Sequence, residues 1–524
     1  MDEAMRLEDL PEKWDLIIIG GGITGAGVLS EASRFGLRVL LLERNDFAGG
    51  TSSRSSKMIH GGFRYLGEGK ISLTLACVEE RDRLLREAPG LVEPLEFLLP
   101  VHNDRGLGRW PLKLGFTLYD LIARKRNHRF YGPGAFSILS PHVNQNGLIG
   151  GFRFSDAQSD DARLVLRLIN EALLSGSHVQ ALNYVTVNHI RRDSSGRVRG
   201  VDATDTETLF QRGLSCSAVI NATGPWTEGL HPSPNPKLHL RPLRGSHLIF
   251  PLWVLPTRAV LSFYHPSDNR PMFAMPWEDV LLVGTTDIDH NEDLSAEPAI
   301  TPEEVSYLIE GLQDAFPHVN ISMKDCLSSF AGIRPVLSMG KKAPSEESRE
   351  HVIWVNNGLV TVTGGKFTTF RRMALNALKA AQPFLPSAQF KPRQSLHFSP
   401  APYRAHINHD LSPFCWRRLC GRYGKGAETL VSRAATEDLN RIPGTKTLWA
   451  ELPFVARHEQ VCHLSDLMLR RVRIGLLTPS GGVRHLDRIQ EMCAPVMSWD
   501  ETRWKKERDL YQELWKAKYA PPED

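Results

Sequence analysis

Long hydrophobic runs are missing from this chain of 524 residues. No stretch reaches the roughly 18 uninterrupted apolar residues that a membrane span needs. Residues 1–13 are acidic and polar, without the apolar core of a secretory signal or the arginine-rich character of a transit peptide. We therefore expect a cytoplasmic protein, and peripheral attachment to the inner face of the cell membrane stays open.

Cysteine and net charge are also scarce. The seven cysteines are odd in number and scattered, which is typical of a reducing compartment. Cys415 and Cys420, the nearest pair, have no His or Cys partners at ligand spacing, so we interpret them as ordinary helix residues and expect no metal site. The formal charge of +4 is small for this length and gives no reason to expect a nucleic-acid partner.

A glycine-rich segment, residues 15–43, organises the rest of the chain. A short apolar run predicts a buried parallel strand, and a sharp turn follows with the spacing Gly20-x-Gly22-x-x-Gly25. These glycines allow a tight turn, close approach of a pyrophosphate and close packing of the next helix, whose N-terminus favours phosphate. A second apolar strand ends in Glu43, about 20 residues past the glycines, where a carboxylate can bind ribose hydroxyls. The pattern predicts a bound dinucleotide but does not separate FAD from NAD.

The next segment, residues 44–66, is polar and rich in glycine, hydroxyl groups and basic side chains. A solvated loop with a helix cap is the simpler interpretation of such a run. Its position directly after the nucleotide-binding pattern favours a binding loop instead, because its hydroxyls and cations can bind phosphate or ring atoms.

Seven motifs follow one another along nearly the whole chain: IIIGGGITGAG, TSSRSSKMIHGGFRYL, SDAQSDDARLVL, NATGPW, GTTD, AGIRP and GGKFTTFR. Together they make the chain resemble the FAD-dependent glycerol-3-phosphate dehydrogenase family. The resemblance implies FAD as the cofactor and oxidation of sn-glycerol 3-phosphate to dihydroxyacetone phosphate, by hydride transfer from C2 to flavin N5, with the electrons passed on to a quinone. The alternatives are a glycerol-3-phosphate oxidase that uses O2, an amine or amino-acid oxidase of the same superfamily, and a flavin-containing scaffold without chemistry.

The patterns and the resemblance together predict an α/β fold with three parts. The first is a discontinuous FAD-binding domain of the doubly wound, Rossmann-like, glutathione-reductase type. The second is a mostly antiparallel β-sheet substrate domain or cap, where short β-like runs are frequent. The third is an α-helical C-terminal domain behind a linker rich in Pro, Ser, Gln and His. The expected ranges are 14–75, 155–235 and 351–384 for the first, 76–154 and 236–350 for the second, and 396–524 for the third.

By motif match, the site residues of the family carry over to positions of this chain. His60 is the expected general base, since a neutral imidazole is poised near operating pH. Arg334 is expected in a tight turn between a glycine and a proline, as a fork for phosphate. The expected substrate-binding residues are Arg64, Tyr65, Thr286, Arg334 and Lys366, and the expected catalytic residues are His60, Arg64, Arg334 and Lys366. The expected cofactor-binding residues are Gly20, Gly22, Gly25, Glu43, Thr51, Ser52, Ser53, Lys57, His60, Gly61, Ala222, Thr223, Gly224, Trp226, Gly332, Gly365, Lys366, Phe367 and Thr368.

One departure concerns the predicted flavin loop. Ala48, Gly49 and Gly50, which precede Thr51, loosen this loop. The affinity for FAD and its covalent or non-covalent attachment therefore stay open, as do the electron acceptor and a homodimer.

Two basic segments allow more than one interpretation. Residues 107–130 place apolar and aromatic residues before a basic end, which fits an interfacial anchor or, equally, a buried helix with a solvated end. In the C-terminal domain, Ser498 and Glu501 are expected to form a capping box. Six charged residues are expected on a solvated helix face. These are Arg457, His458, Glu459, Arg470, Arg471 and Arg473.

Overall fold

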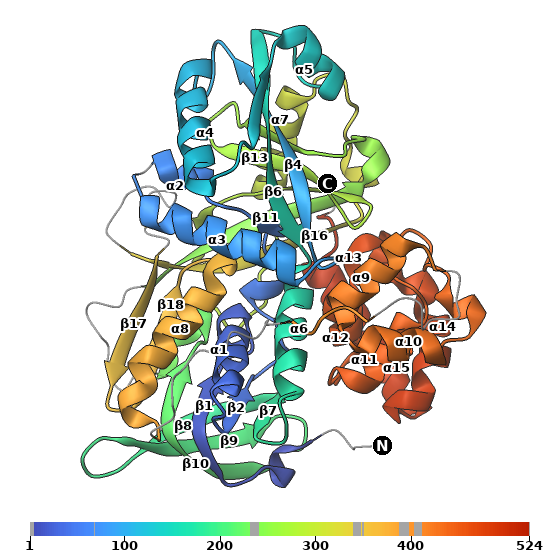
Figure 1. Cartoon of the computed structure of the whole chain (residues 1–524). Helices are drawn as coiled ribbons and strands as arrows, with labels where there is room; N and C mark the ends of the chain where they lie inside the picture. The colour runs from blue at the N-terminus through green and yellow to red at the C-terminus, as the bar shows by residue number, and fades with distance from the viewer. Residues whose placement is uncertain are drawn as a thin grey trace.

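The computed structural model describes residues 5–67, 69–230, 240–338, 347, 350–386, 398–402 and 411–522. They form two β-sheet regions, drawn one above the other in Figure 1, and a helical region beside them. The predicted linker between the last part of the first sheet region and the C-terminal helices lies mostly outside the described residues.

The first sheet contains the glycine-rich segment. Strand β1 (Lys13–Ile19) pairs in parallel with β2 (Val39–Leu42) on one side and with β10 (Gln211–Asn221) on the other. The order across the sheet is β17 (His351–Asn356), β18 (Leu359–Gly364), β10, β1, β2 and β7 (Val179–Leu182), and the hairpin β8 (Val185–Arg192) and β9 (Val198–Asp205) is joined to β10.

The two faces of this sheet are covered differently. Leu16 and Ile18 pack under helices α1 (Ile23–Arg34), α6 (Asp161–Leu173) and α8 (Phe370–Ala381). Ile17 and Ile19 pack instead with apolar side chains of β8 and β9. The predicted fold class is confirmed, but "doubly wound" is wrong in detail, because an antiparallel hairpin rather than helices covers the second face.

The second sheet is mostly antiparallel, as predicted; the exception among its described strand pairs is the parallel pair of β4 with β12. Strand β6 runs without a break across the boundary predicted between residues 154 and 155. The strands are β3 (Met58–Ile59), β4 (Val92–His102), β5 (His128–Tyr131), β6 (Leu148–Ser159), β11 (Leu240–Pro251), β12 (Val260–Tyr264), β13 (Pro271–Trp277), β14 (Val280–Gly284), β15 (Ile288–Asp289) and β16 (Ser328–Leu337). The accompanying helices are α2 (Phe63–Gly67), α3 (Ile71–Glu87), α4 (Arg109–Ala123), α5 (Pro133–Leu139) and α7 (Pro302–Ala315).

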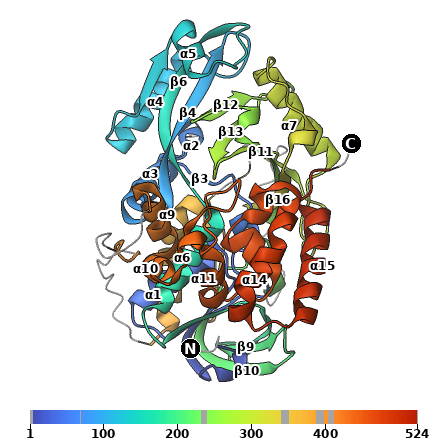
Figure 2. The same cartoon turned by 90° about the vertical axis from the view of Figure 1, so that its right-hand side faces the viewer.

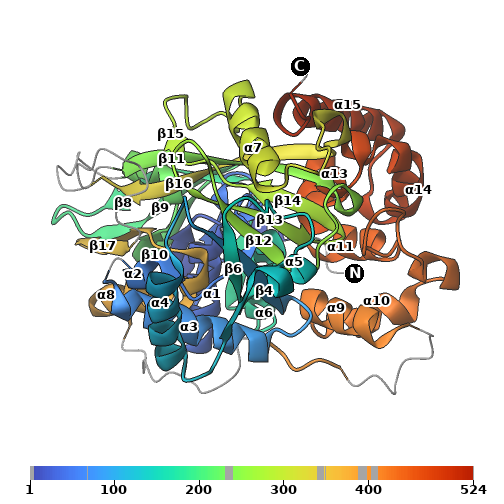
Figure 3. The ribbon, with the colours of Figure 1, turned by 90° about the horizontal axis from the view of Figure 1, so that it is seen from above.

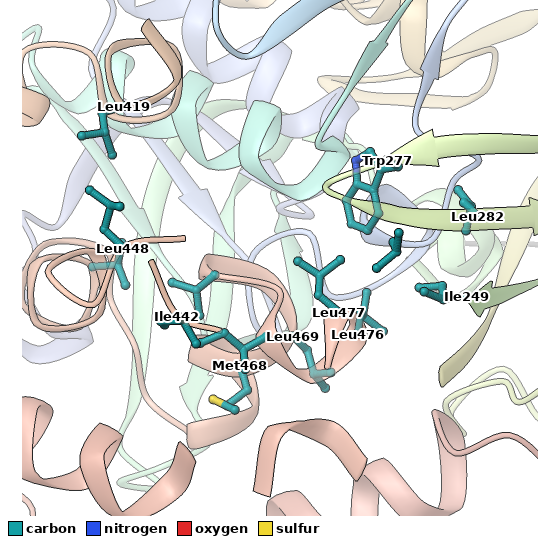
Figure 4. Packing of buried hydrophobic residues seen from close by; sticks show 14 of the residues in the cluster. Ile249, Trp277, Leu282, Leu419, Ile442, Leu448, Met468, Leu469, Leu476 and Leu477 are labelled. Carbon is teal, nitrogen blue, oxygen red and sulfur yellow. The ribbon is translucent and has the colours of Figure 1, made fainter. Parts of the chain in front are cut away.

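The C-terminal region is helical, as predicted. Its helices gather on one side of the molecule (Figure 3). Its apolar core is continuous with the second sheet: Figure 4 shows Leu476 and Leu477 close to Trp277 and Ile249. The helices are α9 (Pro413–Tyr423), α10 (Gly426–Arg433), α11 (Glu451–His458), α12 (Leu464–Asp466), α13 (Ile474–Leu477), α14 (Leu486–Met497) and α15 (Glu501–Lys518), with a π-helical turn at Leu467–Arg471.

Two predictions for this region are wrong. The N-cap of α15 is Asp500, whose carboxylate accepts a hydrogen bond from the Arg503 backbone N–H, so Ser498 does not cap the helix. The expected solvated face is largely buried. The Glu459 carboxylate accepts from the Arg163 guanidinium, and Arg470, Arg471 and Arg473 turn toward carboxylates and carbonyls of their own and other segments. Cys415 and Cys420 lie in α9 as expected, and all seven cysteines are free thiols.

Candidate functional site

The carboxyl ends of strands β1, β2, β10 and β18 open on an elongated cavity of about 1580 Å³. The second sheet forms the opposite wall with residues of β12, β13 and β16. Ligands of open α/β sheets bind at this edge, outside the carboxyl ends of the strands. The cavity therefore lies where the sequence predicts the nucleotide site.

The glycine-rich turn forms the floor of the cavity. Gly20 has φ of +111°, and a Cβ built on it would stand 2.6 Å from the carbonyl oxygen of Ala222. A Cβ on Gly25 would stand 1.8 Å from the carbonyl oxygen of Gly20. Neither contact is sterically possible, so glycine at position 20 lets the turn lie against the end of β10, and glycine at position 25 lets α1 pack against the turn. Gly22 is the N-cap of α1 and lines the cavity, which brings the helix N-terminus to the space.

Glu43 follows strand β2 and lines the cavity. One of its carboxylate oxygens accepts a hydrogen bond from the backbone N–H of Gly21 at 2.6 Å, and the other accepts from Asn45 at 2.9 Å. Burial raises the pKa of this carboxyl, and the two backbone donors oppose that rise. The carboxylate is therefore held in one orientation beside the glycine turn.

The loop after Glu43 divides into residues that reach the cavity and residues behind its wall. Thr51 and Ser52 line it, and Ser52 Oγ accepts a hydrogen bond from the Ile23 backbone N–H at 2.9 Å. Lys57 does not reach the cavity, contrary to the prediction, because its buried ammonium binds the Asp161 carboxylate at 2.8 Å and the Ser53 carbonyl at 2.7 Å. Ser53, Gly25 and Gly61, also predicted to bind the cofactor, lie outside the cavity lining as well.

The remaining predicted cofactor residues come together from distant segments. The end of β10, the strand β16 and the turn after β18 all contribute to the lining. Trp226 is fixed by a 2.8 Å hydrogen bond from its indole N–H to the Leu294 carbonyl, and the Arg44 guanidinium lies over its ring. The lining residues from these segments are Ala222, Thr223, Gly224, Trp226, Gly332, Gly365, Lys366, Phe367 and Thr368.

His60, Tyr65 and Lys366 stand together in the cavity wall. The His60 and Tyr65 rings are stacked with centroids 6.2 Å apart, and the Lys366 ammonium lies over the Tyr65 ring. A cation over an aromatic face is attracted by the ring quadrupole. Arg64 lies in α2, directly before Tyr65 in the sequence, but its side chain is outside the described part of the structure.

Arg334 lies in the middle of strand β16, opposite Leu243 of β11, so the predicted tight turn is wrong. It lines the cavity and donates to the Asp287 carboxylate at 3.0 Å. Arg270, which the sequence interpretation missed, also lines the cavity and donates to the other oxygen of Asp287 at 2.9 Å. Two guanidiniums and one carboxylate together carry a net positive charge, as a phosphate site requires.

Thr286 is not in the cavity lining, although it was predicted to bind substrate. Its buried hydroxyl donates to the Glu304 carboxylate at 2.6 Å and accepts from the Ser246 backbone N–H at 2.9 Å. The neighbouring Thr285 lines the cavity, and its hydroxyl accepts from Arg334 at 2.9 Å. Consecutive residues point in different directions, so a motif match cannot decide which of two adjacent threonines reaches a site.

A buried carboxylate, Asp156, was also missed. It lines the cavity, and one oxygen accepts hydrogen bonds from the Gly61 backbone N–H at 2.9 Å, from Arg81 at 2.7 Å and from the Tyr119 hydroxyl at 3.3 Å. Burial raises the pKa of Asp156, and the Arg81 guanidinium opposes that rise. We name Asp156, Arg81 and Tyr119 the Asp156 triad. Its members come from β6, α3 and α4, and no sequence spacing connects them.

The part of the cavity lining that includes helix α4 is apolar, and we call this part the apolar arm. Leu112 on the buried side of α4 lines this arm, whereas Trp110, Leu114 and Leu121 on its other side are 68%, 64% and 70% exposed. Residues 107–130 thus contain a helix that packs on one side and exposes apolar side chains on the other, and the interfacial anchor stays a prediction. Within the described residues, no helix is long and apolar enough to cross a membrane. The arm is lined by Phe63, Phe97, Leu99, Leu107, Pro111, Leu112, Phe154, Tyr264 and Phe273.

Comparisons with known proteins agree with this architecture. The model of the family described as "FAD dependent oxidoreductase" matches residues 15–371, and that of the "C-terminal domain of alpha-glycerophosphate oxidase" matches residues 387–504. The chain is 31% identical to the aerobic glycerol-3-phosphate dehydrogenase of Staphylococcus aureus (strain MRSA252) over 496 residues, which cover 88% of this chain and 86% of that protein. It is also 31% identical to the enzyme of the same name from Staphylococcus haemolyticus (strain JCSC1435) over 522 residues, with 94% and 92% covered.

Solved structures give the same result. The glycerol-3-phosphate dehydrogenase from Bacillus halodurans, complexed with FAD, is similar with a TM-score of 0.73 and 25% identity, and the match covers 97% of this chain and 96% of that one. The L-alpha-glycerophosphate oxidase from Mycoplasma pneumoniae, with FAD bound, shares the fold with a TM-score of 0.59 at 18% identity, over 74% of this chain and 98% of that one.

Proposed function

The chain belongs to the FAD-dependent oxidoreductase family and, within it, to the aerobic glycerol-3-phosphate dehydrogenases, and we propose that it oxidises sn-glycerol 3-phosphate to dihydroxyacetone phosphate. The observation that carries the substrate is that three cationic side chains, Arg270, Arg334 and Lys366, line the same cavity as the glycine floor. A phosphate dianion needs such cations, whereas an amine or an uncharged alcohol does not.

The cavity fits FAD as the cofactor. Gly20 and Gly22 line the cavity without side chains, so that a pyrophosphate can approach the backbone, and the N-terminus of α1 faces the same space. Glu43 is held beside this floor, at a suitable place for ribose hydroxyls. When bound, FAD supplies the two-electron acceptor for the hydrogen on C2 of the substrate.

We assign the protein's tasks in this reaction to residues that line the cavity on both sheets. Arg334 and Arg270, bridged by Asp287, hold the substrate phosphate, and Lys366 over the Tyr65 ring adds a further cation. His60 takes the proton of the C2 hydroxyl, because imidazole is the side chain whose ordinary pKa suits a base near neutral pH.

We also propose that the electrons leave to a membrane quinone. The apolar arm connects the cavity with α4, whose outer face exposes Trp110, Leu114 and Leu121. Arg124, which follows α4, and Arg129 in β5 give this end of the molecule positive charge toward anionic lipid headgroups. The alternative acceptor is O2, with release of peroxide.

The reaction is tested under anaerobic conditions with purified protein. sn-Glycerol 3-phosphate should bleach the flavin absorbance at about 450 nm, whereas glycerol and D-amino acids should not. If FAD is bound and the absorbance does not change with sn-glycerol 3-phosphate, the proposed substrate is wrong.

The acceptor is tested with the protein reduced in this way. A water-soluble quinone should reoxidise it faster than air-saturated buffer does, with little peroxide formed. Replacing Leu114 by Glu, on the outer face of α4, should weaken binding to vesicles of anionic lipid while flavin bleaching by substrate stays unchanged. Rapid peroxide production equal to the rate of substrate oxidation would favour the oxidase instead.

A further inference from the structure

The C-terminal helical region forms part of the cavity wall. Ser465 and Arg470, around the π-helical turn, and Leu514 of α15 line the same space as Glu43 and the glycine floor. Helix α15 runs along the outer side of the region, and its C-terminal end lies near β16 in Figure 2. A ligand that fills the cavity therefore meets residues from both ends of the chain.

Two hydrogen bonds from Ser329 attach the chain that follows α15 to strand β16. The Ser329 backbone N–H donates to the Tyr519 carbonyl at 2.7 Å, and the Ser329 hydroxyl donates to the Ala520 carbonyl at 3.1 Å. Three residues further along β16, Gly332 lines the cavity. The strand that forms one wall of the cavity thus also holds the C-terminal segment in place.

The Tyr519 side chain reaches the predicted flavin loop. Its hydroxyl accepts a hydrogen bond from the Arg54 guanidinium at 2.9 Å and donates one to the Glu297 carboxylate, which also pairs with Arg54. Burial raises the pKa of Tyr519 to about 12, so the hydroxyl keeps its proton for Glu297 near neutral pH. Arg54 and Glu297 both line the cavity.

The other end of the Arg54 guanidinium fixes the loop itself. Its second terminal nitrogen donates to the carbonyls of Gly49 and Gly50, with 3.1 Å to the latter. These two glycines loosen the loop in the sequence, because a glycine backbone has the most conformational freedom to lose on folding. A guanidinium that holds both carbonyls restricts this freedom, and Tyr519 restricts the guanidinium.

We propose that the C-terminal domain retains the dinucleotide in the cavity, and that Tyr519 is the positioning residue through which it does so, by holding Arg54 against the carbonyls of Gly49 and Gly50. This inference rests on the proposed FAD site. It gives the C-terminal domain a role in cofactor binding, and it predicts non-covalent FAD whose release rate depends on a hydroxyl near residue 520.

The experiment measures FAD release from the full-length holoenzyme. Tyr519→Phe keeps the ring and removes only the hydroxyl. The matched control is Tyr511→Phe in α15, the helix that Tyr519 directly follows. Tyr511 is also buried, but its hydroxyl donates to the Gly481 carbonyl, which does not line the cavity. After dilution, free FAD is followed by its fluorescence, and the melting temperature of each variant is recorded alongside.

We expect Tyr519→Phe to release FAD about tenfold faster than the wild type, because the hydrogen bonds of the hydroxyl with the charged groups of Arg54 and Glu297 are lost. Tyr511→Phe should lower the melting temperature as much or more and change the release rate less than about twofold. Equal release rates in Tyr519→Phe and wild type, or the same acceleration in both variants, would overturn the role of Tyr519. FAD that stays with the protein after acid precipitation would be covalent and would overturn it as well.

These outcomes differ from a failure of the proposed function. A purified wild-type protein that carries no flavin, or a yellow protein that glycerol 3-phosphate does not bleach, would contradict the proposed reaction. The release experiment uses no substrate, so equal rates from a yellow and active enzyme would contradict only the inference about Tyr519.

Discussion

The glycine floor of the cavity and the seam beneath the C-terminal domain are both buried, yet they are built in opposite ways. In the floor, hydrogen-bonded partners are close in sequence: Gly21 and Glu43 are 22 residues apart. In the seam, which we define as the buried ion pairs of Asp46, Asp160, Arg471 and Arg473, the partners are 425 and 313 residues apart. The floor can therefore be read from a short sequence pattern, and the seam cannot.

The difference lies in what identifies a buried residue. The floor is apolar and rich in glycine, which predicts burial directly. The seam consists of arginines and carboxylates, whose residue types predict exposure unless a partner is known. Arg471 is fully buried, with two hydrogen bonds of 2.6 and 2.8 Å to Asp46, and Arg473 is 2.9 Å from Asp160. The local sequence around residues 457–473 shows the arginines but not the distant carboxylates that pair with them. It therefore predicted a solvated helix face, which was wrong.

The largest expected effect comes from breaking a seam pair. Arg471→Ala leaves the buried Asp46 carboxylate without its bidentate partner, and we expect a loss of about 3–5 kcal/mol in the free energy of unfolding. The matched control is Arg417→Ala, which breaks a bidentate pair with Glu93 whose arginine is 53% exposed. Its cost should be below about 1 kcal/mol. Denaturant unfolding of both variants gives the comparison, and similar losses would mean that burial does not distinguish the seam.

Acid weakens the same pairing without deleting a side chain, so a smaller effect is expected. Burial by itself would raise the pKa of Asp46, but the guanidiniums of Arg471 and Arg470 lower it from 3.8 to about 2. A carboxyl with a lowered folded-state pKa stabilises the fold fully above its unfolded value, and this contribution is lost as the pH falls from about 4 toward 2. The free energy of unfolding should therefore fall over this range, with a shallower slope in Asp46→Asn. Parallel slopes would show that Asp46 does not carry the acid sensitivity.

The floor should respond to volume rather than to charge. Gly25→Ala places a methyl group where the Gly20 carbonyl oxygen stands, at 1.8 Å, and we expect overpacking to cost about 2 kcal/mol and to lower the FAD content of the purified protein. Gly134→Ala in α5 is the control, because a Cβ there meets nothing within 4 Å. Normal FAD content in Gly25→Ala would mean that α1 can move away from the sheet at little cost.

The same contrast explains how much of the site could be predicted. The strand, turn and acid of the floor, the helical C-terminal region and the mostly antiparallel second sheet follow from local patterns, and the motif match brought His60, Tyr65, Arg334 and Lys366 to one cavity. The motif match predicted Lys57 and Thr286 in the site because neighbouring residues of their motifs lie there. In the structure, their side chains bind buried carboxylates of other segments and do not line the cavity. Arg270 and Tyr519 have no local signal, since only the folded chain brings them near the cavity.

The smallest expected effect concerns His60, the proposed base. It shows whether His60 is positioned by residues close to it in the sequence, as in the floor, or by distant segments, as in the seam. The Tyr119 hydroxyl of α4 is 3.3 Å from Asp156, which accepts from the Gly61 backbone next to His60. Tyr119→Phe leaves Arg81 on Asp156 but removes two hydrogen bonds, the one that Tyr119 donates to Asp156 and the one that it accepts from Arg81 at 2.8 Å, each worth about 1 kcal/mol.

If the Asp156 triad positions His60, this loss should appear as a several-fold lower kcat/KM for glycerol 3-phosphate and a shifted pH profile, with little change in melting temperature. Thr117→Ala on the same helix is the control, because the Thr117 hydroxyl donates to the Lys113 carbonyl within α4. A pH profile that matches the wild type would mean that the segment around His60 holds its own geometry. A shifted profile would mean that the segment around His60, although its motif is visible in the sequence, depends on Tyr119, 59 residues further along the chain in a helix whose outer face we propose to meet the membrane.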